Sequence, residues 1–305
     1  MKWQGRERSS NIEDRRSQGG GGLGGGFNGG LGSGGGFRIP TSGRAGGGLG
    51  GIGLIVVIGI ICLALGINPL TLLTGGDLTG GSGSSFTQSR PLPDAGQDEL
   101  ADFVGVVVKD TETVWTDIFR ANGMTYTPPK VVLFTSQTQS GCGIADANSG
   151  PFYCPNDQKV YIDLSFYNQL RRQFGAPGDF AQAYVLAHEV GHHVQNLTGV
   201  LGKFNQQRQA MSEAQANAYS VRVELQADCY AGVWANRIGQ ENLLDQGDVE
   251  EAITAANAIG DDTLTRGTVS PRNFTHGTSA QRMVWLERGI KSGNPADCDT
   301  FSGSI

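Results

Sequence analysis

An uncharged, strongly apolar stretch divides this chain of 305 residues into two unlike parts. No charged residue occurs from Ala45 to Gly76, and the centre of the stretch, Ile52–Ile67, reads IGLIVVIGIICLALGI. With its flanks, over residues 49–73, it is long enough to cross a bilayer at about 1.5 Å per residue. A helix buried in a protein core would normally keep a polar face, and this one has none. The sequence therefore predicts one transmembrane helix.

The charges on either side of this stretch predict its orientation. Seven Lys and Arg residues lie within residues 1–50, and after the stretch none occurs until Arg90. Because basic residues favour the cytoplasmic side, we expect a single-pass protein of the inner (plasma) membrane with a cytoplasmic N-terminus and a periplasmic or otherwise extracytoplasmic domain. A cleaved signal peptide is the alternative, although such peptides have short basic starts and some fifty residues precede this one. Both interpretations export the domain.

Composition sets the domain boundaries. Of 48 glycines, 21 lie in residues 1–53, where apolar side chains are too few to offset the entropy of ordering the chain. We expect a disordered cytoplasmic tail over residues 1–48, a flexible linker over 74–92 and one folded domain over 93–305. Residues 1–50 carry seven basic and three acidic residues, which leaves 16 basic and 26 acidic residues in the remainder. An acidic domain argues against nucleic acid as a partner.

Four of the five cysteines lie in the exported part, at Cys142, Cys154, Cys229 and Cys298. An even number of cysteines in an oxidising compartment predicts two disulfides, and four cysteines allow three pairings. We favour Cys142–Cys154 because it would close a short loop rich in turn-forming residues. A structural zinc site is the competing use of four cysteines, but no CxxC pair supplies the usual ligand spacing.

Apolar periodicity and turn residues predict the elements of the folded domain. Helices are expected over residues 99–122, 166–174, 180–197, 205–238, 248–259 and 279–290. Strands are expected over residues 130–135 and 159–164. This pattern indicates an α+β fold that is mostly helical with a small sheet.

One helix carries an unusual cluster, because residues 188–193 read His-Glu-Val-Gly-His-His. In a helix, His188 and His192 lie one turn apart on the same face, so both imidazoles can bind one zinc ion. Glu189 lies beside them, where it can take a proton from zinc-bound water as general base. The alternative is a helix face of solvated polar residues, which the apolar flank of the same helix disfavours. The sequence therefore predicts a site for one Zn²⁺.

The third protein ligand has to come from another residue type, because three of the four histidines lie in this cluster. Glu224 is the candidate, and Asp228 follows it by four residues, so both carboxylates lie on one helix face. One can bind zinc while the other accepts the second ring N–H of a ligating histidine. The alternative is that both are surface charges.

The remaining histidines, His193 and His276, lie outside this ligand set. His193 is rotated by one residue from His192, so it faces away from the metal and is expected to pack or to support the site. His276 precedes a helix start at Ser279 and belongs either to the capping turn or to the active site, where its imidazole would stabilise an oxyanion from across the cleft.

These residues carry a resemblance to known proteins. The Glu-x-x-x-Asp after HExxH resembles the gluzincin metallopeptidases, in which the Glu is the third zinc ligand and the Asp supports a ligand. The chain is similar, more specifically, to the bacterial neutral zinc metallopeptidase family of membrane-anchored proteins. The resemblance implies a zincin-like domain, with an edge strand around Val160–Leu164 that pairs with an extended peptide. The matching passages are GINPL (66–70), SGCG (140–143), GPFYCP (150–155), VYIDL (160–164), AHEVGHHVQ (187–195), ELQAD (224–228) and HGTSAQR (276–282).

The expected function is that of a membrane-anchored zinc metallopeptidase that hydrolyses peptide or protein substrates. Zinc would be held by His188, His192 and Glu224, with Glu189 as general base. The alternative is a non-catalytic envelope protein that binds partners and carries a structural zinc or none. An intact Glu189 favours the enzyme, because a purely structural site has no use for it.

Overall fold

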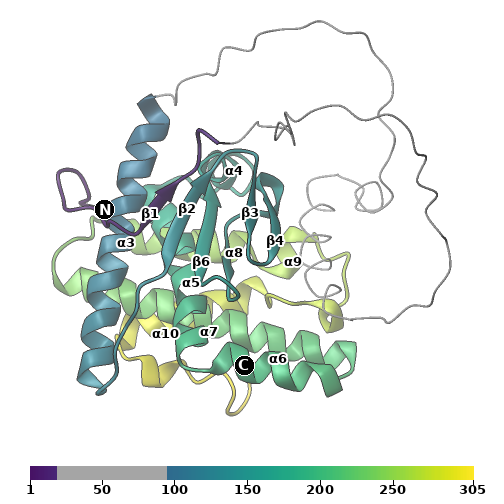
Figure 1. Ribbon diagram of the computed structural model, residues 1–305. Coiled ribbons are helices and arrows are strands. Elements are labelled where there is room, and N and C mark those ends of the chain that lie inside the picture. The colour runs from purple at the N-terminus through teal and green to yellow at the C-terminus, as the bar shows by residue number, and fades with distance from the viewer. Residues whose placement is uncertain (19–94) are drawn as a thin grey trace, which may run out of the picture.

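The computed structural model describes residues 1–18 and 95–305 (Figure 1). The predicted transmembrane helix over residues 49–73 and the linker over 74–92 lie outside the described residues. Within the two described ranges, no helix combines the length and the apolar character needed to cross a bilayer.

The described elements confirm a mostly helical α+β fold with a small sheet. The helices of seven or more residues are α3 (Ala95–Ala121), α4 (Phe166–Arg172), α5 (Asp179–Leu197), α6 (Val200–Gln207), α7 (Glu213–Gln240), α8 (Asp248–Ala258) and α10 (Ser279–Ser292). A short helix, α9 (Asp261–Leu264), precedes α10. The strands are β1 (Ile12–Asp14), β2 (Lys130–Phe134), β3 (Gln137–Ser140), β4 (Gly143–Asp146), β5 (Phe152–Cys154) and β6 (Lys159–Asp163).

Four strands form the main sheet in the order β1-β2-β6-β5. β1 and β6 run parallel to β2, with Val131 opposite Val160, and β5 runs antiparallel to β6. β2 and β6 read as continuous apolar runs because four of five residues in each are buried. The strands β3 and β4 form a separate hairpin.

The expected edge strand is wrong in its position. The resemblance implied an edge around Val160–Leu164, but β6 lies between β2 and β5 and is paired on both sides. The strand at the edge on this side of the sheet is β5. Its three residues lie in the cysteine loop, where no strand was predicted. β5 pairs only with Lys159–Tyr161 of β6, so on this side an extended peptide could add to β5 or to the end of β6 beyond Tyr161.

Helix α5 lies in the core, where it contacts α7 and α8. The absence of a side chain at Gly191 allows a close approach to α7, since a Cβ there would lie 3.0 Å from the backbone oxygen of Ala227. The long helix expected over residues 205–238 is instead two helices. Ser212 and Gln215 form a capping box that starts α7 after the break.

Residues 1–18 fall in the range predicted as a disordered tail, but they are folded onto the domain. Trp3 contacts Phe103 of α3 edge-to-face at 5.5 Å between ring centroids, and β1 joins the sheet (Figure 1). The compositional argument failed because 20 of the 21 glycines in residues 1–53 follow Gln18. The glycine content averaged over the whole tail is high, but residues 1–18 contain only one glycine, Gly5.

Both predicted disulfides are confirmed. Cys142 is bonded to Cys154, with a Cα–Cα separation of 5.8 Å, and Cys229 is bonded to Cys298, with a separation of 5.6 Å. The first fastens the turn of the β3–β4 hairpin to the end of β5. The second fastens α7 to the C-terminal segment.

Candidate functional site

The HExxH residues and Glu224 meet between α5 and α7. His188 Nε2 lies 3.2 Å from Glu224 Oε2, and His192 Nε2 lies 3.6 Å from Glu224 Oε1. All three residues offer ligand atoms within 4.8 Å of one another. The helical spacing placed the two histidines on one face, and the close packing of α5 on α7 brings the carboxylate to them.

Each of these imidazoles has a partner on its other nitrogen. His188 Nδ1 lies 2.8 Å from Asp228 Oδ1, and His192 Nδ1 lies 2.8 Å from Gln195 Oε1. Both partners are oxygen acceptors, so each Nδ1 carries a proton, and each Nε2, which faces Glu224, is the nitrogen that would bind a metal ion. The amide of Gln195 is itself fixed, because its Nε2 donates to the backbone oxygen of Val223 at 2.7 Å.

Asp228 lies in a fully buried polar network. Arg282 donates two hydrogen bonds to its carboxylate, at 2.9 Å and 2.8 Å, and the Tyr184 hydroxyl donates a third at 2.6 Å. Burial alone would raise the pKa of Asp228, but Arg282 and His188 outweigh burial and lower it to about 2. Asp228 is therefore a permanent carboxylate that orients the His188 ring.

The charge state of the ligand set also favours a cation. Burial would raise the pKa of Glu224, but His192 and His188 outweigh it and hold the pKa well below its ordinary value. Burial would lower the pKa of His188, but Asp228 and Glu224 raise it to about 10. The two carboxylates thus stabilise positive charge at this position, whether it is a proton on the imidazole or a metal cation.

Glu189 lies on the same helix but outside the ligand set. Its side chain is buried and accepts a hydrogen bond from the backbone N–H of Tyr153 in β5. Burial raises the pKa of Glu189, against the lowering effect of His192 and His188. A carboxylate with a raised pKa beside a metal site suits proton transfer better than metal binding.

His276 interacts electrostatically with Glu224. Its Nδ1 lies 3.1 Å from Asp261 Oδ1, which fixes the ring, and the backbone N–H groups of Thr275, His276 and Gly277 donate to Asp261 Oδ2. The cap of α10 is Thr278 and not His276. The role of His276 at the site stays a prediction.

His193 points away from the ligand set. It is fully buried, with Nδ1 3.0 Å from the Tyr153 hydroxyl and Nε2 2.7 Å from the backbone oxygen of Thr127. The Tyr153 hydroxyl also accepts from Asn196 at 3.0 Å. These contacts fix the active-site helix to β5.

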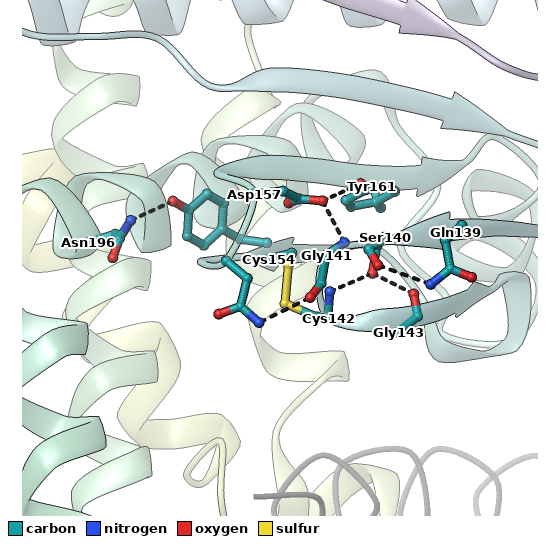
Figure 2. Close-up of a disulfide and its surroundings, with 11 residues drawn as sticks. Gln139, Ser140, Gly141, Cys142, Gly143, Cys154, Asp157, Tyr161 and Asn196 are labelled. Atoms are coloured by element: carbon teal, nitrogen blue, oxygen red, sulfur yellow. Dashed lines mark hydrogen bonds between the residues drawn. A yellow bond between two sulfur atoms is a disulfide. The ribbon is translucent and has the colours of Figure 1, made fainter.

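The disulfide Cys142–Cys154 fixes the opposite flank of β5 (Figure 2). Asp157 accepts from the backbone N–H of Gly141 at 2.6 Å and from the Tyr161 hydroxyl at 2.7 Å. The hairpin is thereby tied both to β5 and to the neighbouring strand β6. The strand that contacts Glu189 is thus rigidly held on both sides.

The donor set fits zinc. A tetrahedral zinc ion with ligands at about 2.0–2.2 Å separates neighbouring ligand atoms by about 3.4 Å. The two measured separations from Glu224, 3.2 Å and 3.6 Å, bracket that value. Two imidazole nitrogens and one carboxylate form the set of a catalytic site with one position left open.

Comparison with known families agrees with this geometry. The family model described as "Putative neutral zinc metallopeptidase" matches residues 1–301. The chain belongs to this family. The match covers residues 1–18, the HExxH helix and Glu224, so it includes every part of the site described above. The family name implies zinc and a hydrolase.

Two relatives match the chain over all or more than half of its length. An uncharacterized protein of Escherichia coli K12, YpfJ, is 46% identical over 308 residues and covers all of both chains. An uncharacterized protein of Mycobacterium tuberculosis H37Rv is 46% identical over 193 residues, which is 59% of this chain and 64% of the relative. No solved structure matches the chain.

Four residues of the site escaped the sequence analysis as individual contributors: Gln195, Tyr153, Asp261 and Arg282. Gln195 had a usable signal, since it lies three residues after His192 and so on the same helix face. The others contact site residues that lie 15 to 94 positions away along the chain, so no local spacing predicts their contacts.

Proposed function

We propose that this chain is a zinc-dependent metallopeptidase that cleaves peptide bonds with Glu189 as general base. The observation that carries the proposal is the convergence of His188, His192 and Glu224 beside a buried Glu189. A zinc ion bound there would polarise the scissile carbonyl and make water a stronger nucleophile. The chain's own residues supply the proton transfers and the positioning.

Glu189 accepts the proton of the attacking water and returns it to the leaving amine. Its raised pKa suits both steps, because the group must gain and lose a proton near neutral pH. His276, fixed by Asp261, stabilises the negative charge that develops on the carbonyl oxygen. Asp228 and Gln195 hold the two imidazoles in the ligating orientation.

The substrate is proposed to be an extended peptide that lies along β5. This strand ends the sheet on the side of the metal site, and its Tyr153 backbone contacts Glu189. An extended chain can add to such an edge through backbone hydrogen bonds, which places a peptide bond near the reacting groups. The two disulfides support a site of action in an oxidising compartment, outside the cytoplasm.

The test is a peptide-library digest with the purified full chain, its zinc content measured in parallel. We expect cleavage that a chelator abolishes and added zinc restores. Glu189→Gln keeps the size of the side chain but removes the base, so it should keep one zinc per chain and lose about 10²–10⁴-fold in rate. Zinc-loaded protein that cleaves nothing would support the alternative, a binding protein with a structural metal.

A further inference from the structure

The first eighteen residues are tied into the domain at their start. The α-ammonium of Met1 lies 2.7 Å from Asp179 at the first turn of α5 and 3.2 Å from Asp248 at the first turn of α8. Burial would lower the pKa of this amino group, but the two carboxylates outweigh burial and raise it. The backbone N–H of Lys2 donates to Leu243 at 2.9 Å. The segment thus bridges the helix that carries HExxH and its neighbour.

The middle of the segment pairs with α3 through complementary charges. Arg6 forms two hydrogen bonds with the buried carboxylate of Asp110, at 2.5 Å and 2.8 Å. Arg8 pairs with Asp102, and Arg16 lies 3.1 Å from Asp98. Arg16 also pairs with Asp14 of the segment itself, at 2.6 Å. The domain partners of the three arginines all lie on α3, so a row of acidic residues along one helix is matched by basic residues of the segment.

The end of the segment is part of the sheet. Ile12 pairs with Val131 in the parallel ladder between β1 and β2, and the backbone N–H of Arg15 donates to Leu133 at 2.7 Å. Glu13 forms an ion pair of 2.8 Å with Lys159 of β6. These backbone bonds make the segment a strand of the domain rather than an appendage.

We infer that residues 1–18 are a structural part of the peptidase domain and lie in the same compartment as residues 95–305. The contacts above are at hydrogen-bond distance, and they cannot form across a hydrocarbon layer about 30 Å thick. A single membrane span between the two parts would separate them in either orientation, so the shared compartment requires that the chain between them does not cross the bilayer once. Three of the basic residues from which the orientation was predicted, Arg6, Arg8 and Arg16, have carboxylate partners in the domain. Their charges are explained by these ion pairs and do not indicate the membrane orientation.

The disulfides indicate which compartment the two parts share. Cys142–Cys154 and Cys229–Cys298 both lie in the part that residues 1–18 complete, and disulfides persist in oxidising surroundings. The N-terminal segment is therefore expected outside the cytoplasm. This inference does not depend on peptidase activity.

Thiol labelling of the full chain in spheroplasts tests the shared compartment. In a Cys62→Ala background, Gln4→Cys and Val284→Cys each place one free thiol at an exposed position, one in the segment and one on α10. We expect a membrane-impermeant maleimide to label both before permeabilisation. Labelling of one position but not the other would overturn the inference. Labelling of both only after permeabilisation would support the shared compartment and overturn its assignment as oxidising.

Charge reversal tests the contact itself on the purified full chain. Arg6→Glu should lower the Tm by at least about 6 °C, because it leaves the buried Asp110 facing a like charge. Arg6→Glu with Asp110→Arg should recover most of the loss. The matched control is the same exchange at Arg8 and Asp102, which are both more than half exposed and should change the Tm little. An unchanged Tm in Arg6→Glu, or a double variant no more stable than the single ones, would contradict the docking.

Discussion

Acidic residues gather at two places along helix α5, but the two clusters have different occupants. Beside the middle and second half of the helix, Glu224 and Asp228 face the imidazoles of His188 and His192. At its first turn, Asp179, Asp248 and Glu251 bring their oxygens within 4.8 Å of one another, and two of them bind the α-ammonium of Met1. Each cluster alone has the donor number of a metal site.

The difference between them lies in the donor type and in the source of positive charge. The first cluster combines imidazole nitrogens with a carboxylate, a set that suits zinc. The second offers oxygen atoms alone, which suit hard cations, and the Met1 ammonium already lies beside two of its carboxylates. A group of acidic residues therefore does not by itself define a metal site. The other groups around the carboxylates, imidazoles in the first cluster and an ammonium in the second, decide whether a metal ion binds.

The largest expected effect separates the two clusters by their need for zinc. Glu224→Ala removes one of three protein ligands, so the zinc content after dialysis should fall from about one per chain to near none. Glu251→Ala, which removes a carboxylate from the other cluster, should leave the zinc content at the parent level. Atomic emission on both variants gives the comparison. If the two variants retained equal amounts of zinc, Glu224 would not be a zinc ligand.

The next effect concerns chemistry at the first cluster. His276→Ala should lower kcat/KM by about 10²–10³-fold with the zinc content unchanged, because it removes a group that stabilises the oxyanion. Asp261→Asn should cost less, since it alters the orientation of His276 and not its presence. A normal kcat/KM in His276→Ala would show that His276 serves only in the turn before α10 and takes no part in catalysis.

A smaller loss is expected from the support of His192. Gln195→Met has about the same volume but no acceptor for the imidazole N–H, and it should weaken zinc binding by about 10–100-fold. Asn196→Ala is the control, because Asn196 contacts the Tyr153 hydroxyl and not a ligand. Competition with a zinc-sensing dye measures both. A similar affinity in the two variants would show that Gln195 is not needed to orient the ring.

The smallest effect belongs to the second cluster. Asp248→Asn weakens a buried partner of the Met1 ammonium, so it should lower the free energy of unfolding by about 1–3 kcal/mol while zinc stays bound. Asp245→Asn, at 3.6 Å from the ammonium and half exposed, should change it by less than about 0.5 kcal/mol. Denaturant unfolding distinguishes the two. Zinc loss in Asp248→Asn would mean that the clusters are coupled through α5.

Helices with a clear period were predictable nearly to the residue. The expected helix over residues 180–197 is Asp179–Leu197, and the one over 279–290 is Ser279–Ser292. Short strands in the cysteine loop, β3 to β5, escaped because three or four residues carry too little periodicity. The strand β1 escaped because the glycines that follow it dominated the composition.

The sequence by itself determined which residues can carry the chemistry. Helical periodicity puts His188 and His192 on one face, and it puts Glu224 and Asp228 on one face of another helix. The tertiary structure decided that these two faces meet, which strand lies at the edge beside them, and that residues 1–18 belong to the domain. Spacing along one helix is local geometry, whereas a contact between α5 and α7 depends on packing such as that of Gly191 on Ala227.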